Sequence, residues 1–157
     1  MVGLPADLLD RSPFELSGGQ LRRVAIAGVV SMKPKVLALD EPAAGLDPRG
    51  RDEVLENMTK MHRMGMTVCL VSHNMEDVAR LCQRLLVLSE GKLVADGTPR
   101  EIFSRSSFVA EVGLRQPEVV SLMERLRSRG WNVRADVVNI QEAYAEIIRE
   151  LGRRQGS

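Results

Sequence analysis

Two short apolar segments, residues 36–39 and 67–71, constrain the fold of this chain more than any other feature. Each is a continuous, mostly apolar run, as in strands that are covered on both faces, and we expect residues 36–39 to be buried in that way. Between the two segments, apolar residues recur at helical spacing up to Gly65. A strand, a helix and a second strand in this order predict an α/β fold with parallel strands.

The remaining sequence adds helices on either side of this unit and a hairpin after it. Apolar residues at helical spacing follow Ser17, and the dipeptide Glu90-Gly91 separates two short apolar runs. Thr98-Pro99, followed by Glu101, is typical of a capped helix start. The other predicted elements are helices at residues 18–30, 75–82, 117–129 and 140–151 and hairpin strands at 85–88 and 93–95.

Composition narrows the classes of function. The 157 residues are the length of one domain, and 44% of them are apolar. A net charge of +1 and an aromatic content of 3% argue against nucleic acid as a partner, which needs a basic surface or stacking rings. No apolar run approaches the roughly 20 residues that span a bilayer, and the first residues lack a secretory signal pattern, so we expect a soluble or peripheral protein. Cys69 and Cys82 lack CxxC spacing and are expected to be buried structural thiols.

The segment Ser17, Gly18, Gly19 and Gln20 opens the first predicted helix and predicts an anion-binding site. The glycines let the backbone approach a ligand, and the serine offers a hydroxyl. Unpaired N–H groups at a helix N-terminus carry partial positive charge. The alternative interpretation is a flexible turn with an ordinary N-cap.

Polar residues follow both predicted strands. Asp40 and Glu41 end the first strand, and His73 comes shortly after the second. Open α/β sheets bind ligands at the carboxyl ends of their strands. One carboxylate can hold Mg²⁺ while its neighbour activates a water, and the histidine can reach a terminal phosphate. The alternatives are solvated acids at a strand exit and an ordinary loop histidine.

Taken in order, these segments resemble those of ATP-binding-cassette (ABC) ATPases. Residues 16–20 resemble the signature motif, and residues 36–41 resemble the Walker B strand with its catalytic glutamate. Gly45-Leu46-Asp47 resembles the D-loop, and His73 resembles the switch histidine. Four motifs in family order make the resemblance specific.

The resemblance implies a role for each of these residues. Glu41 would polarise the attacking water, His73 would contact the γ-phosphate and Asp40 would serve Mg²⁺. Ser17, Gly18, Gly19 and Gln20 would contact the γ-phosphate of ATP held by the opposite subunit. Asp47 would signal across the dimer interface.

Two further stretches, residues 10–15 and the region from Gly113 onward, resemble the ATPase subunits of energy-coupling-factor transporters, including the cobalt and nickel uptake branch. This implies a partial P-loop NTPase (ABC ATPase) fold over residues 1–104 and a small C-terminal α-rich appendage over residues 105–157. It implies ATP and Mg²⁺ as cofactors and uptake of a metal ion or vitamin as the function. The implied partners are a second ABC ATPase subunit, a transmembrane coupling subunit and a substrate-binding membrane subunit, at the cytoplasmic face of the cell membrane.

One family motif, Gly-x-x-x-x-Gly-Lys-[Ser/Thr], has no match in the 157 residues. This loop holds the phosphates through its backbone and its lysine. By resemblance it would lie ahead of Met1, so we expect the C-terminal part of an ATPase that is inactive alone. The strand at residues 36–39 would then lack the neighbouring strands that the preceding part of the domain supplies. This predicts exposed apolar faces and self-association.

Three functions stay open at this point. The first is the importer ATPase subunit, present as its C-terminal part. The second is a non-hydrolysing module that donates its signature motif to a full-length partner ATPase. The third is a non-transport cassette protein, such as a DNA-repair or translation ATPase, against which the near-zero net charge and the C-terminal region speak.

Overall fold

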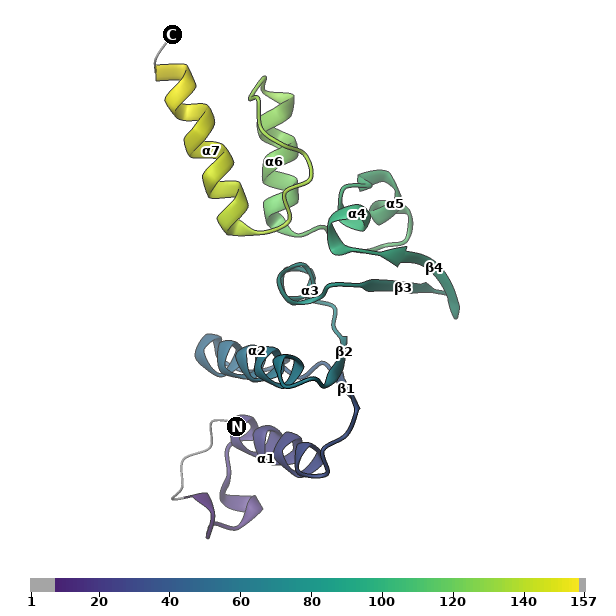
Figure 1. Ribbon diagram of the computed structural model, residues 1–157, viewed down its shortest axis with the longest axis vertical. Helices are drawn as coiled ribbons and strands as arrows, with labels where there is room; N and C mark the ends of the chain where they lie inside the picture. The colour runs from purple at the N-terminus through teal and green to yellow at the C-terminus, as the bar shows by residue number, and fades with distance from the viewer. Residues whose placement is uncertain (1–7, 156–157) are drawn as a thin grey trace. The chain divides into compact units, whose positions relative to one another are not determined.

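The computed structural model describes residues 8–155, and the chain divides into two compact units, Met1–His73 and Asn74–Ser157 (Figure 1). The first unit contains η2 (Pro13–Glu15), α1 (Gly18–Ser31), β1 (Val36–Asp40), α2 (Pro48–Arg63) and β2 (Thr67–Val71). The second unit contains α3 (Met75–Leu81), β3 (Leu85–Ser89), β4 (Lys92–Gly97), α4 (Pro99–Phe103), α5 (Ser106–Glu111), α6 (Glu118–Ser128) and α7 (Ile140–Gln155).

In the first unit, β1 and β2 form a parallel pair, as the two apolar segments predicted. Val36 lies opposite Thr67, and Asp40 lies opposite Val71. A small core joins α1, β1 and α2 through Val30, Leu37 and Met61, which are all buried. Because the strands are parallel and in this register, the residues that follow each strand emerge at the same edge of the sheet.

Local chemistry explains where the two long helices of this unit begin. The Ser17 side chain caps α1, and the Asp47 carboxylate caps α2 by accepting a hydrogen bond from the Gly50 N–H at 3.0 Å. Pro48 then occupies the first turn of α2, where its missing N–H has no cost. Asp47, which the resemblance assigns to the D-loop, is therefore a helix N-cap in this structure.

The prediction that the first strand is buried on both faces is wrong. Leu37 is 3% exposed, but its neighbour Val36 is 62% exposed. Among the described residues, β1 pairs only with β2, and the small core covers only one face of the pair. For the same reason Cys69 of β2 is exposed. Cys82, at the end of α3 in the second unit, is half-buried, so the expectation of two buried thiols is also wrong.

The second unit begins with α3 and the predicted hairpin. Strands β3 and β4 pair antiparallel, with a register shift between Val87 and Leu88. Glu90 and Gly91 both have positive φ, 49° and 75°, as the two central residues of a type I′ turn require. The two-residue turn expected at this dipeptide is confirmed.

One core joins residues on both sides of position 104. It contains buried apolar side chains from α3, α4, α5, α6 and the segment before α7, namely Met75, Val78, Phe103, Val109, Val120 and Val138. Helix α5 was not expected from the sequence. The division into an ATPase part at residues 1–104 and an appendage at 105–157 differs from these compact units and stays a prediction.

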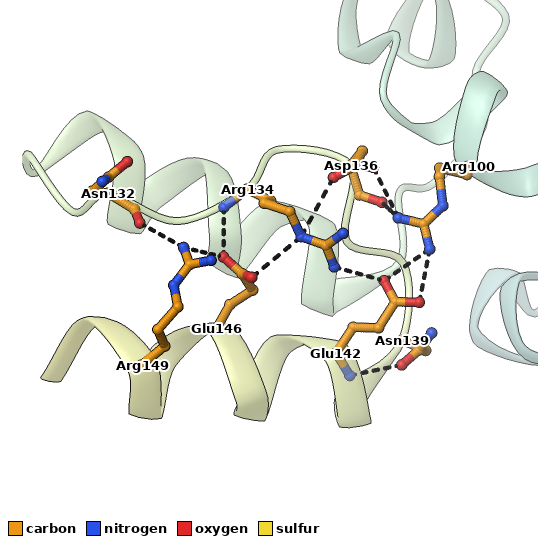
Figure 2. A network of polar contacts seen from close by, with 8 residues as sticks. All are labelled: Arg100, Asn132, Arg134, Asp136, Asn139, Glu142, Glu146 and Arg149. Carbon is orange, nitrogen blue, oxygen red and sulfur yellow. Dashed lines mark hydrogen bonds and ion pairs between the residues drawn. The ribbon is translucent and has the colours of Figure 1, made fainter. Parts of the chain in front are cut away.

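The segment 130–136 between α6 and α7, which has no regular secondary structure and is called the strap below, lies along α7 (Figure 2). Its odd-numbered residue Val133 is buried in a core with Met123 and Ala143. Its even-numbered residues meet α7 instead: the Asn132 N–H donates to Glu150 at 3.2 Å, and the Arg134 N–H donates to Glu146 at 3.1 Å. Two carboxylates one turn apart on α7 thus accept from every second N–H of the strap. This is possible because alternate residues of the strap face α7, and residues four apart on a helix share one face.

Arginines complete this polar network (Figure 2). Arg100 of α4 donates to Glu142 at 2.7 and 2.9 Å and to Asp136 at 2.9 Å. Arg134 and Arg149 lie 3.2 and 2.7 Å from the Glu146 carboxylate. Each acidic side chain is therefore paired, and the network joins α4, the strap and α7.

Candidate functional site

The candidate hydrolytic residues sit at the end of β1. Asp40 is its last residue and is exposed, and Glu41 follows it. Glu41 has φ 45°, a left-handed backbone conformation that is uncommon for a residue with a side chain. The Glu41 N–H still donates to the carbonyl of Val71 at 2.9 Å, so the chain leaves the sheet only after this residue. The left-handed turn then aims the Glu41 side chain toward the end of β2.

Glu41 and His73, 32 residues apart in sequence, are in direct contact. The Glu41 Oε1 atom accepts the His73 backbone N–H at 2.8 Å and contacts His73 Nδ1 at 2.7 Å. A carboxylate only accepts hydrogen bonds, so Nδ1 carries the proton in this contact. The histidine side chain is 81% exposed, and the glutamate side chain is 32% exposed. The sequence placed these two residues at adjacent strand ends, and the structure brings them together.

The electrostatic setting of Glu41 favours its ionised form. Burial by itself would raise the pKa of the Glu41 carboxyl. The hydrogen bonds from the side chain and backbone of His73, with a further one from Ser72, outweigh burial and hold the pKa below its ordinary value of 4.5. Glu41 is therefore a carboxylate at neutral pH and can accept a proton or orient a water.

The signature segment forms the N-terminus of α1. The Ser17 hydroxyl accepts from the Gln20 N–H at 3.3 Å, and the Gln20 side chain accepts from the Ser17 N–H at 2.9 Å. This reciprocal capping box is the N-cap alternative considered above. Contact between these residues and a phosphate stays a prediction.

Signature and D-loop residues line one open pocket of about 350 Å³. A Cβ atom on Gly19 would lie 3.1 Å from a Leu46 methyl, so the glycine permits this close approach. The residues that line the pocket are Ser17, Gly19, Gln20, Arg23, Gly45, Leu46, Asp47 and Gly50. The structure therefore brings two of the four predicted motifs together here and the other two together at Glu41 and His73.

Comparison with known proteins supports the resemblance in sequence and in fold. The profile of the ABC transporter family matches residues 1–44. The chain is 49% identical over 152 residues to the energy-coupling factor transporter ATP-binding protein EcfA2 of Caldanaerobacter subterraneus subsp. tengcongensis, covering 96% of this chain and 53% of the relative. It is 51% identical over 156 residues to EcfA2 of Symbiobacterium thermophilum, covering 99% of this chain and 54% of the relative.

A solved structure agrees with these relatives. The structure of cbiO1 from Clostridium perfringens, described as part of the ABC transporter complex cbiONQ, superposes with a TM-score of 0.60 at 40% identity. The match covers 78% of this chain and 49% of that protein. The chain is therefore similar in sequence and in fold to ATP-binding proteins of ABC transporters. It spans about half the length of the curated relatives it matches.

The similarity to ABC ATPases indicates what the residues at the end of β1 would hold. ABC ATPases bind ATP, and carboxylate, phosphate and water oxygens are the ligands that Mg²⁺ prefers. Asp40 is an exposed carboxylate and fits a site that the phosphates and water complete. Within residues 8–155, no cluster of three or more histidine, cysteine or acidic side chains could hold a metal by itself. No helix in that range is both long enough and apolar enough to span a membrane.

Two arginines of α1 make long-range contacts that the sequence did not predict. Arg22 donates to the backbone carbonyls of Pro42 and Ala44, and Arg23 pairs with Glu53 of α2. An arginine that bonds to backbone carbonyls 20 or 22 residues away leaves no local pattern. Only the packing of α1 against the loop after Glu41 reveals the contact.

Proposed function

We propose that this chain is the ATP-binding subunit of an energy-coupling-factor importer, which couples ATP hydrolysis to uptake of a metal ion or vitamin. Its relatives at 49% and 51% identity are ATP-binding proteins of such transporters. The observation that carries the proposal is the contact between Glu41 and His73 at adjacent strand ends. It joins an ionised carboxylate to an exposed imidazole where open α/β sheets bind ligands.

The geometry supports a proposed task for each of these two residues. The Glu41 carboxylate orients the attacking water and accepts its proton. His73 already uses its Nδ1 proton on Glu41, so a neutral ring offers only a lone pair at Nε2. Contact with a phosphate oxygen therefore requires either a second proton on the ring or release of the ring from Glu41. The contact between Glu41 and His73 would therefore respond to a bound nucleotide.

The remaining roles follow the family pattern. Asp40 would hold Mg²⁺, which when bound polarises the phosphate oxygens. Ser17, Gly18, Gly19 and Gln20 would meet the γ-phosphate of ATP on a second ATPase subunit, and Asp47 would lie at that interface. The further partners are a transmembrane coupling subunit and a substrate-binding membrane subunit at the cytoplasmic face of the membrane.

A second candidate function uses the signature alone. The pocket that Ser17 and Gln20 line with the D-loop is open, so it can receive a ligand held by another subunit. The 157 residues contain no Gly-x-x-x-x-Gly-Lys-[Ser/Thr] segment, and we expect the chain by itself not to hydrolyse ATP. In this case it completes a composite site on a full-length ATPase.

The first candidate is tested by joining these 157 residues to the N-terminal half of the Symbiobacterium thermophilum relative. We expect this chimera to hydrolyse Mg-ATP and Glu41→Gln to lower kcat by about 100-fold or more, because the general base is lost. Glu15→Gln is the control, since Glu15 is an exposed carboxylate in the cap of η2. A folded chimera without ATPase activity, or one that Glu41→Gln leaves unchanged, would contradict the proposal.

The second candidate is tested by mixing the 157-residue chain with the same relative, after the signature serine of the relative has been replaced by arginine. Restored ATPase activity that Ser17→Arg abolishes and Glu41→Gln preserves identifies a donated signature. Ser12→Arg is the matched control, because Ser12 has the same capping box at η2 but does not line the pocket. If the wild-type chain restores no activity, this candidate is wrong.

A further inference from the structure

Arg22 reaches from the signature helix to the loop that follows Glu41. Its Nη1 atom lies 2.6 Å from the carbonyl oxygen of Ala44 and 3.3 Å from that of Pro42. We propose that Arg22 is a positioning residue, which holds the loop after β1 so that Glu41 keeps its left-handed conformation and its contact with His73. This rests on the proposed function in one respect, namely that Glu41 is the hydrolytic group.

The conformation of Glu41 needs external support. A residue with a side chain at φ 45° is strained, and such strain persists only where the surroundings determine the conformation. On the N-terminal side, the Glu41 N–H is bonded to Val71 of β2. On the C-terminal side, the loop itself contributes one turn bond, from the Ala44 N–H to the Glu41 carbonyl at 3.1 Å.

Arg22 adds the missing restraint on that C-terminal side. The carbonyl oxygens it binds belong to the residues one and three positions after Glu41. With the turn bond between Ala44 and Glu41, this holds the start and the end of the turn at the same time. A guanidinium is suited to the task because it carries several donors in a rigid plane and stays charged at all relevant pH values.

The Arg22 side chain also links the signature residues at the start of α1 to the loop that follows Glu41. Arg22 is in the second turn of α1, and the capped N-terminus of α1 carries the signature residues. Ser17 and Gly19 line the pocket together with residues 45–47. The carbonyls that Arg22 binds belong to the same loop between β1 and α2. A ligand that shifts the start of α1 would therefore act on the loop that sets Glu41.

The neighbouring arginine shows that this contact is specific. Arg23 pairs with Glu53 of α2, which also pairs with Arg49 at 3.3 Å. That cluster joins helix to helix through side chains, whereas Arg22 bonds to the backbone of the loop. Replacing Arg49, which is 89% exposed, therefore changes surface charge without touching the loop and provides a matched control.

The first test is hydrogen exchange of the 157-residue chain, measured by mass spectrometry without nucleotide. We expect Arg22→Met to speed exchange across residues 42–47 by about tenfold, since bonds from a charged donor are lost there. Arg22→Lys should restore much of the protection, because an ammonium can still donate to a carbonyl. Exchange in β2 and α2 should stay unchanged, and Arg49→Met should change nothing in the loop. Equal exchange in all variants would overturn the proposal.

The second test separates positioning from general stability. The backbone N–H of His73 donates to Glu41, so Arg22→Met should also speed amide exchange at His73, because that contact is weakened. Arg22→Lys should slow it again. Faster exchange across residues 42–47 with unchanged exchange at His73 would mean that Arg22 only stabilises the loop, which would overturn the proposal. Neither readout involves ATP, so a chimera without ATPase activity would refute the proposed function and leave this result standing.

Discussion

At the residue scale, the pair of Glu41 and His73 makes the first unit sensitive to acid. The pKa of Glu41 is lowered in the folded state, so its contribution to stability is present above its ordinary value of 4.5. That contribution is lost as the pH falls through the lower folded value. Acid should therefore weaken the contact between Glu41 and His73 and lower the stability of the first unit.

Replacing His73 with alanine tests this contact. Because burial raises the pKa of Glu41 and the side-chain bond from His73 lowers it, His73→Ala should move the Glu41 titration to higher pH, although the backbone N–H at position 73 can still donate. Carbon NMR of the carboxyl groups measures the midpoint at a concentration below any self-association. Glu101 is the internal control, because bonds from Thr98 lower its pKa in the other unit. A Glu41 midpoint that does not move would show that the contact is absent in solution.

At the element scale, the strap and α7 depend on carboxylates in place of a partner strand. Glu146 is 7% exposed and accepts the N–H of Arg134, while the side chains of Arg134 and Arg149 pair with it. Removing it leaves the Arg134 N–H without its acceptor and takes one of several acceptors from each of the two arginine side chains. The stability of this part of the second unit should therefore depend on one side chain.

The expected loss for Glu146→Ala is about 1–3 kcal/mol of unfolding free energy, the usual cost of leaving such groups unsatisfied. Glu146→Gln should cost less, because the amide oxygen can still accept from Arg134. Urea unfolding followed by the fluorescence of Trp131, the single tryptophan, measures both, since its ring packs in the adjacent core. Glu111→Ala, at an exposed site of α5, is the control. Equal losses for Ala and Gln would assign the effect to charge alone.

At the scale of the whole molecule, apolar surface and unpaired strand edges predict self-association. Among the described residues each strand has one partner only. Large apolar side chains stand exposed on several elements, including Met32, Val36, Val71, Leu88, Leu93 and Ile140. Surfaces of this kind pair with other chains.

We expect the isolated chain to sediment as a concentration-dependent mixture, and Val36→Lys to weaken that association by placing a charge on the open face of β1. Sedimentation velocity over a range of concentrations measures both. Phe14→Lys is the matched control, because Phe14 is 99% exposed but lies on η2, away from any strand. A wild-type chain that is monodisperse and melts cooperatively would contradict the expectation.

The elements themselves follow closely from local pattern. The strand at residues 67–71, the turn at Glu90-Gly91 and the capped helix after Thr98 were predicted at or near their observed bounds. Their signals lie within a few residues of one another, since a cap, a positive-φ turn or an apolar run is a local property. Helix α5 carries a weaker local signal and was missed, whereas the non-helical connection between α6 and α7 was expected after Gly130.

By itself, the sequence determined the order of motifs, the parallel α/β arrangement and the family resemblance, because these depend on residue type and spacing along the chain. Only the tertiary structure decided that Glu41 contacts His73, that Arg22 donates to carbonyls of the loop after Glu41 and that one face of β1 is open. Each of these is a contact, or a missing contact, between residues far apart in sequence. Such contacts depend on strand register, helix packing and the neighbours available to cover a face, none of which is encoded in a local pattern.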